Sequence, residues 1–221
     1  MTGFGAFTRR SLGIILVLMP IVIAAHLPAC SGTPQHAPLP PGTSVLAFGD
    51  SVTYGTGAAP SENYPLKLAA RTGWNIHNAG IPGDTADLAK LRITEAIEAS
   101  KPALVIVEIG GNDFLRQRPE SAVKEDIRAI LKAVRQSGAL PVLVAVPRLS
   151  MLAVLSRPGD SPIYAELANE EGVLLVEGVF SDILSDNRLK TDPIHPNAAG
   201  YLQLADGIAK TLVKSGLLAK P

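Results

Sequence analysis

Three side chains in this sequence have the types and spacing needed to activate a serine hydroxyl: Ser51, Asp192 and His195. A serine hydroxyl is a weak nucleophile until an imidazole takes its proton, and the imidazole needs a carboxylate to hold its tautomer. Asp192 and His195 lie three residues apart, so one loop can place the carboxylate on the ring Nδ1. These residue types point to nucleophilic chemistry at a carbonyl carbon.

Attack on a carbonyl also requires hydrogen-bond donors for the developing oxyanion. The candidates are the backbone N–H groups of Ser51 and Gly83 and the side-chain amide of Asn112. Glycine at position 83 lets the backbone approach a substrate closely, and we expect Asp84 or Thr85 to cap the helix that follows.

Each of these segments, taken alone, has an ordinary structural interpretation. Gly-Asp-Ser at residues 49–51 is typical of a turn that leads into a helix, Gly-Asn-Asp at 111–113 of a turn, and His195 of a solvated loop. Their joint occurrence after successive expected strands favours a catalytic site.

The elements that must position these residues alternate between short β-rich segments and helical patterns. Several of the expected strands are apolar at every position, which is typical of parallel strands buried on both faces. The pattern predicts an α/β fold, a three-layer α/β/α sandwich around a five-stranded parallel sheet in the flavodoxin-like order 2-1-3-4-5. The expected strands are 45–48, 74–79, 104–109, 142–146 and 173–176, and the clearest helices are 119–137 and 196–214.

Composition limits the other function classes. The 221 residues include 20 basic and 20 acidic side chains, so the chain has no net charge with which to attract nucleic acid, and we expect no nucleic-acid partner. A single cysteine excludes an intramolecular disulfide and a thiolate metal cluster. Only His77 and His195 lie in the expected folded part, so we expect no metal site.

Four blocks together resemble the SGNH hydrolase superfamily, also called the GDSL family: Gly-Asp-Ser at 49–51, Asn-Ala-Gly-Ile-Pro-Gly-Asp-Thr at 78–85, Gly-Gly-Asn-Asp at 110–113 and Asp-Pro-Ile-His-Pro-Asn at 192–197. The second and third blocks are most similar to the periplasmic thioesterase I, arylesterase and lysophospholipase branch. The resemblance implies Ser51 as nucleophile, Gly83 and Asn112 as oxyanion donors, Asp192 as orienter and His195 as general base.

The resemblance also implies a reaction that needs no cofactor. We expect a serine esterase that hydrolyses small carboxylic esters or thioesters, with lysophospholipids among the candidates, through an acyl-enzyme on Ser51. Two alternatives stay open: an acetylesterase acting on polysaccharide or peptidoglycan, and a non-catalytic lipoprotein that binds a lipid or glycan. Selectivity for acyl chain length separates the expected esterase or thioesterase from the acetylesterase.

Two segments near the expected site each allow two interpretations. Arg116 and Arg118 either meet an anionic head group or are simply solvated. The apolar stretch 147–155 either lines an acyl pocket or packs over the sheet.

The N-terminus reads as an export signal. Arg9 and Arg10 precede an uncharged apolar run at 11–25, and Leu-Pro-Ala-Cys at 27–30 resembles a lipobox that would lipidate Cys30. Plain secretion and an uncleaved anchor are the alternatives, and the signal is either of the general or of the twin-arginine type. We therefore expect an exported, membrane-anchored and monomeric protein. Its expected parts are a signal peptide (1–29), a Pro-rich tether (30–42), the hydrolase domain (43–216) and a tail (217–221).

Overall fold

The computed structural model describes residues 1–3, 5, 36–148 and 158–220. The chain divides into two units, Met1–Thr33 and Pro34–Pro221, and every helix and strand described below belongs to the second. The expected signal peptide, Cys30 and most of the apolar stretch 147–155 lie outside the described residues.

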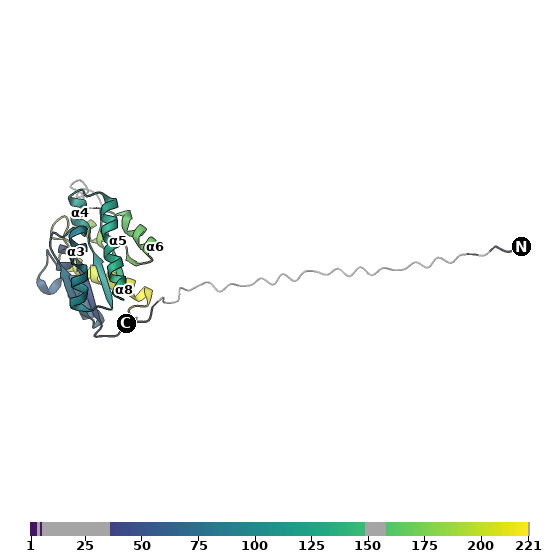
Figure 1. Ribbon diagram of the computed structural model, residues 1–221, viewed down its shortest axis with the longest axis horizontal. Helices are drawn as coiled ribbons and strands as arrows, with labels where there is room; N and C mark the ends of the chain where they lie inside the picture. The colour runs from purple at the N-terminus through teal and green to yellow at the C-terminus, as the bar shows by residue number, and fades with distance from the viewer. Residues whose placement is uncertain (4, 6–35, 149–157, 221) are drawn as a thin grey trace. The chain divides into compact units, whose positions relative to one another are not determined.

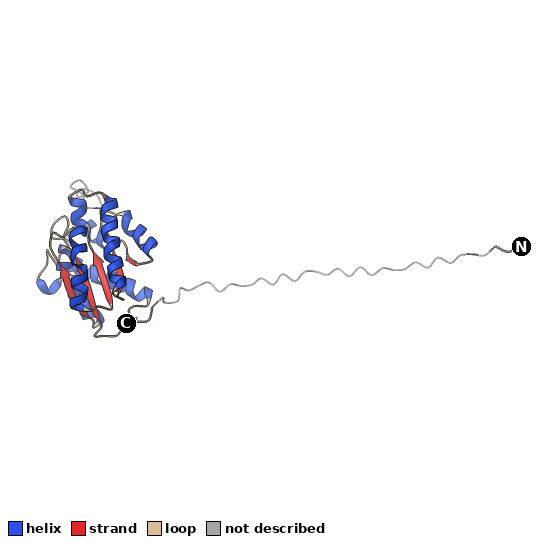
Figure 2. Ribbon diagram, viewed as in Figure 1, coloured by secondary structure: helices blue, strands red, loops and turns tan. Residues whose placement is uncertain are grey.

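A five-stranded parallel sheet forms the centre of the second unit, with the order β2-β1-β3-β4-β5 (Figure 2). This confirms the predicted topology. Each expected strand is present, and its ends lie within two residues of the prediction. The strands are β1 (Ser44–Gly49), β2 (Asn75–Gly80), β3 (Leu104–Glu108), β4 (Leu140–Val144) and β5 (Leu174–Val176).

The helices cover both faces of this sheet. They are α1 (Ser51–Tyr54), α2 (Tyr64–Thr72), α3 (Ala86–Ser100), α4 (Gly111–Leu115), α5 (Glu120–Gln136), α6 (Pro162–Glu171), α7 (Val179–Ser185) and α8 (Ala198–Ser215), with a 3-10 turn at Pro60–Glu62.

The strand order decides which face each helix covers. The chain steps from β1 to β2 in one direction and from β2 through β3, β4 and β5 in the other, so right-handed crossovers place α2 opposite α3 and α5. Figure 1 shows α3 and α5 side by side on one face. The last helix, α8, packs against α2.

The central strands supply the core. All residues of β3 are buried, as are those of β1 after Ser44, because helices cover the sheet on both faces. The helix predicted at 119–137 is confirmed as α5, and its Val123, Ile127 and Ile130 are fully buried. At the sheet edge, β2 exposes Asn75, His77 and Asn78.

The segment that precedes β1 contacts the C-terminal end of the same unit. The N–H of His36 donates to the carbonyl of Ser215 (3.3 Å) and the N–H of Leu39 to that of Leu217 (2.9 Å). The domain boundaries proposed from the sequence stay predictions. Among the described helices, none is both long enough and apolar enough to cross a bilayer.

Candidate active site

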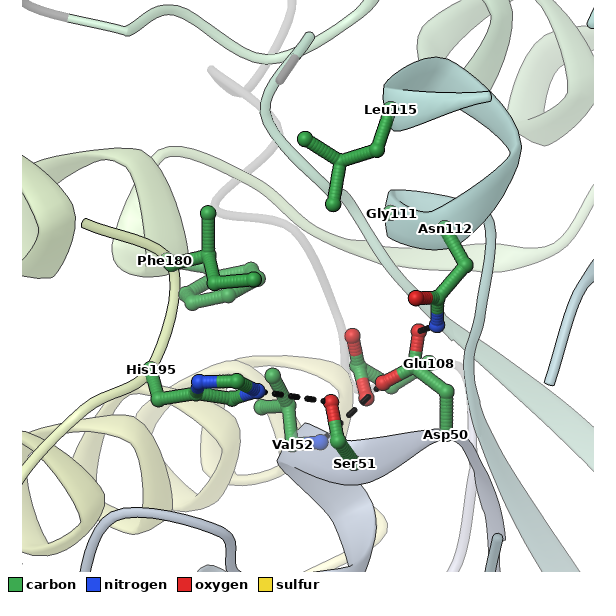
Figure 3. A pocket seen from close by; sticks show the side chains of 10 residues that line it. Asp50, Ser51, Val52, Glu108, Gly111, Asn112, Leu115, Phe180 and His195 are labelled. Carbon is green, nitrogen blue, oxygen red and sulfur yellow. Dashed lines mark hydrogen bonds between the residues drawn. The ribbon is translucent and has the colours of Figure 1, made fainter. Parts of the chain in front are cut away.

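The structure brings Ser51, His195 and Asp192 into one hydrogen-bonded chain. Ser51 begins α1 just after β1, and its Oγ lies 2.9 Å from Nε2 of His195 (Figure 3). On the other side of the ring, Nδ1 lies 2.7 Å from Oδ2 of Asp192. A carboxylate facing Nδ1 keeps the proton on that nitrogen, which leaves Nε2 free to accept the serine proton.

A short loop holds Asp192 in place. Its Oδ1 accepts the backbone N–H groups of Ile194 and His195, both at 2.9 Å. Partial burial raises the pKa of the Asp192 carboxyl, but the hydrogen bonds from His195 and from these N–H groups outweigh it, and the pKa lies below its usual value. Asp192 is therefore ionised at neutral pH and stabilises a positively charged His195.

Gly57 allows a neighbouring loop to approach this histidine. Its φ is +100°, and a Cβ at this position would lie 2.6 Å from the carbonyl oxygen of Pro196 and 3.2 Å from Cβ of His195. The carbonyl of Gly57 accepts the hydroxyl of Thr191 at 2.7 Å. Only glycine permits this contact without displacing the histidine loop.

The side-chain amide of Asn112, near the start of α4, connects two other loops. Its Nδ2 donates to Oδ2 of Asp50 (3.2 Å) and to the carbonyl of Asp84 (2.9 Å). Asp50 precedes Ser51 and Asp84 follows Gly83, so these contacts gather the three expected oxyanion donors at one edge of the sheet. Within the described part of the chain, no hydrogen bond uses the N–H of Ser51 or of Gly83.

A narrow pocket opens above Ser51. Figure 3 shows Leu115 and Phe180 on opposite sides of it, above the Ser51–His195 pair. Gly83 does not line the pocket. Its φ is +86°, and a Cβ there would meet nothing within 4 Å. The pocket lining consists of Asp50, Ser51, Val52, Glu108, Gly111, Asn112, Leu115, Phe180, Ile194 and His195.

The sequence analysis did not identify Asp50 and Glu108, two buried acids that line the pocket next to Ser51. Asp50 is 2% and Glu108 1% exposed, and both line the pocket. Oε2 of Glu108 accepts the hydroxyl of Thr53 at 3.0 Å, and this hydroxyl lies 3.1 Å from that of Tyr64. Burial raises the pKa of Asp50 to about 7 and raises that of Glu108 well above its usual value. In the sequence, the position of Glu108 at the end of the otherwise apolar strand Leu-Val-Ile-Val-Glu indicates a buried carboxylate.

The expected helix cap after Gly83 is wrong. No side chain of Thr85 or Asp84 caps α3, and the N–H of Ala86 instead donates to Oδ2 of Asp113 at 2.9 Å. The hydroxyl of Thr85 donates to Asp87. Asp84 is bound by Arg92, whose Nε lies 2.6 Å from its Oδ2. The capping residue thus comes from α4, which lies next to the start of α3 only in the folded chain.

The two arginines after Asn112 have different environments. Arg118 is neither solvated nor free for a head group, because it forms ion pairs with Asp113, Asp126 and Asp87. Arg116 is exposed, and it donates to the carbonyl of Gly83 at 3.1 Å. Arg118 therefore helps to hold α4 and the start of α3, and Arg116 contacts the loop that carries an expected oxyanion donor.

Comparison with known proteins places this geometry in a family. Residues 47–202 match the model of the GDSL-like lipase/acylhydrolase family. The chain belongs to this family. The match spans all four blocks and confirms the resemblance inferred from them.

Three relatives illustrate the similarity to this GDSL-like chain. A thioesterase 1/protease 1/lysophospholipase L1 of Escherichia coli (strain K12) is 30% identical over 76% of this chain and 83% of the relative. The uncharacterized lipoprotein YqeF of Bacillus subtilis (strain 168) is 25% identical, over 79% of each chain. A crystal structure of TesA superposes with a TM-score of 0.67 at 25% identity, covering 76% of this chain and 97% of TesA.

Residues 1–3, 5, 36–148 and 158–220 contain no group of three or more histidine, cysteine, aspartate or glutamate side chains arranged to hold a metal ion. The expectation of a reaction without metal or cofactor stays a prediction.

Proposed function

We propose that this chain is a serine esterase that hydrolyses carboxylic esters or thioesters through an acyl-enzyme on Ser51. The observation that carries the proposal is the hydrogen-bonded chain from Ser51 through His195 to Asp192. The names of the relatives support the reaction class, since the Escherichia coli protein is a thioesterase and lysophospholipase.

The reaction begins when Oγ of Ser51 attacks the carbonyl carbon and Nε2 of His195 takes its proton. Asp192 stabilises the positive charge that forms on the imidazole. The oxyanion accepts hydrogen bonds from the N–H groups of Ser51 and Gly83. It also shares an N–H of the Asn112 amide with one of the two oxygens, of Asp50 and Asp84, that accept from this amide in the free protein. When the tetrahedral intermediate collapses, the protonated His195 gives its proton to the leaving oxygen or sulfur. A water molecule then repeats the sequence on the acyl-enzyme and releases the acid.

The acyl chain of the substrate lies against the apolar pocket walls. Apolar surface next to the serine comes from Val52, Leu115, Phe180 and Ile194. Each methylene that leaves water against such a surface contributes about 0.8 kcal/mol to binding. We therefore expect medium acyl chains to react faster than acetyl, which favours esters such as lysophospholipids or thioesters over decorated polysaccharide.

Hydrolysis of p-nitrophenyl esters from acetyl to palmitoyl by the purified protein tests this proposal, with Ser51→Ala as the control. Activity that peaks at medium chains and disappears in Ser51→Ala supports it. We expect Asn112→Ala to lower kcat by about 10²- to 10³-fold. Asp192→Asn should fold normally but react poorly, because the imidazole loses its preferred tautomer.

The same series separates the alternatives. A peak at acetyl alone would favour an acetylesterase acting on polysaccharide or peptidoglycan. If no ester were hydrolysed in a Ser51-dependent way, a lipid- or glycan-binding lipoprotein would replace the esterase.

We also propose export, with lipidation at Cys30 as the means of membrane attachment. The sequence at 27–30 supports this, as does a relative that is named a lipoprotein. The wild-type protein should incorporate labelled fatty acid in growing cells and Cys30→Ser should not, because a serine hydroxyl cannot replace the thiol that is acylated. A wild-type protein that stays in the membrane fraction without incorporating the label would favour an uncleaved anchor. We expect a monomer, which gel filtration of the Cys30→Ser protein would test.

A further inference from the structure

One carboxylate connects the first turn of α1 to the amide of Asn112. Oδ1 of Asp50 accepts the N–H of Val52 at 3.0 Å, and Oδ2 accepts Nδ2 of Asn112 at 3.2 Å (Figure 3). Asp50 is the residue directly before Ser51 and caps the helix that begins with it. The nucleophile and the side-chain oxyanion donor are thus tied to the two oxygens of the same group.

We propose that Asp50 is a positioning residue, whose carboxylate holds the amide of Asn112 at the pocket while holding Ser51 at the start of α1. Because Asp50 and the carbonyl of Asp84 accept both N–H groups of this amide, the oxyanion shares the N–H that forms the longer contact, the one to Asp50. This inference rests on the proposed function, in which Asn112 donates to the oxyanion and Ser51 attacks.

Capping alone does not explain an aspartate at this position. Asparagine caps a helix as well as aspartate does, through its single side-chain oxygen. The second contact is different, because Asn112 presents an N–H donor, and an amide nitrogen at position 50 would face it with another donor. An ionised carboxylate offers acceptors on both oxygens, and charge-assisted hydrogen bonds are stronger than neutral ones.

Burial of Asp50 makes the charge on its carboxylate sensitive to pH. Loss of solvent, together with the charges of Asp113 and Asp84, raises the pKa of Asp50 to about 7 although Val52 and Asn112 donate to it. The pKa of Glu108 is also raised, by burial and then by the charge on Asp50. The two buried carboxyl groups therefore disfavour each other's negative charge.

Titratable and charged groups face Asp50 from the elements packed around it. These are Glu108 of β3, Asp84 after β2, Asp113 of α4, Tyr64 of α2, Tyr201 of α8 and Arg92 of α3, which binds the carbonyl of Gly49. His195 lines the same pocket. As the pH falls through about 7, protonation of Asp50 weakens its hold on the amide.

A double-mutant cycle on the full-length protein tests the positioning role, with kcat and KM measured on a medium-chain p-nitrophenyl ester. We expect Asp50→Asn to lower kcat by about 10- to 100-fold with little change in KM, and by less than about 3-fold when Asn112 is already alanine. Asp126→Asn is the matched control, since it removes a buried carboxylate of α5 and should lower the unfolding temperature without changing kcat. Equal losses of kcat in both backgrounds would overturn the proposal.

A second measurement does not depend on activity. The ¹⁵N side-chain amide signals of Asn112, assigned by their loss in Asn112→Ala, should shift with a midpoint near pH 7 in the wild type and in Ser51→Ala. They should not shift there in Asp50→Asn. Signals that stay constant across this range in the wild type would refute the inference, even if position 50 tolerated no substitution. A titrating amide in a protein without Ser51-dependent hydrolysis would support the Asp50–Asn112 coupling and reject the esterase proposal instead.

Discussion

Arg92 joins the carboxyl ends of the neighbouring strands β1 and β2, and its removal should lower the stability of the fold measurably. Its guanidinium donates to the carbonyls of Ala79 (2.9 Å) and Gly49 (2.8 Å), and its Nε lies 2.6 Å from Oδ2 of Asp84. The same group stacks over the ring of Phe48, with Cζ 4.2 Å from the ring centroid. The arginine side chain is only 19% exposed, so water cannot fully replace it.

The expected loss follows from these contacts. Each hydrogen bond to a charged group contributes about 1.5–3 kcal/mol, and breaking a buried ion pair by removing one partner costs about 3–5 kcal/mol. These contributions are not additive, so we expect Arg92→Met to lower the free energy of unfolding by about 3–5 kcal/mol. In a domain of this size, that corresponds to a decrease in Tm of roughly 10 °C.

Urea denaturation followed by circular dichroism measures this loss. Arg71→Met is the matched control, because Arg71 forms a 2.6 Å ion pair with Asp206 at the surface, with side chains 47% and 45% exposed. Exposed pairs contribute at most about 1 kcal/mol. If Arg92→Met were no more destabilising than Arg71→Met, the role assigned to Arg92 would be refuted. Arg92→Lys should fall between the two, since lysine keeps the charge but cannot reach all three acceptors.

Three further predictions concern the buried surroundings of the serine. Because the pKa of Asp50 is raised to about 7, the native state binds the proton of this carboxyl more tightly than the unfolded state does. The contribution of Asp50 to the free energy of unfolding therefore falls as the pH rises from about 4 to 7. Urea titrations at several pH values should show a smaller decrease in the free energy of unfolding for Asp50→Asn than for the wild type. Gly49→Ala should yield little folded protein in expression and circular dichroism trials, because a Cβ at position 49 would lie 2.0 Å from the carbonyl oxygen of Glu108. A stable Gly49→Ala protein would contradict this packing. Tyr164→Phe should lower the free energy of unfolding in urea by about 1 kcal/mol, because the buried carbonyl of Ile109 loses a 2.7 Å hydrogen bond, and no loss would mean that this bond contributes nothing.

Three features could be predicted from the sequence alone: the sheet, its strand order and the pairing of Asp192 with His195. Apolar runs identify buried strands because helices cover both faces of a parallel sheet, and right-handed crossovers leave few possible orders. The aspartate and histidine are close in sequence, so a local loop suffices to join them. The GDSL-like blocks were recognisable because glycines and polar residues stand at fixed offsets from the strand ends.

The contacts between buried polar groups could not be predicted from the sequence. Asn112 binds Asp50, 62 residues away, and Asp113 caps a helix whose first N–H is 27 residues away. Arg118 pairs with three acids instead of facing solvent or a ligand. Hydropathy and helix-capping patterns describe neighbours along the chain, whereas the pKa of Asp50 and the partners of Asn112 depend on burial and on contacts between distant loops, which exist only after the sheet has formed.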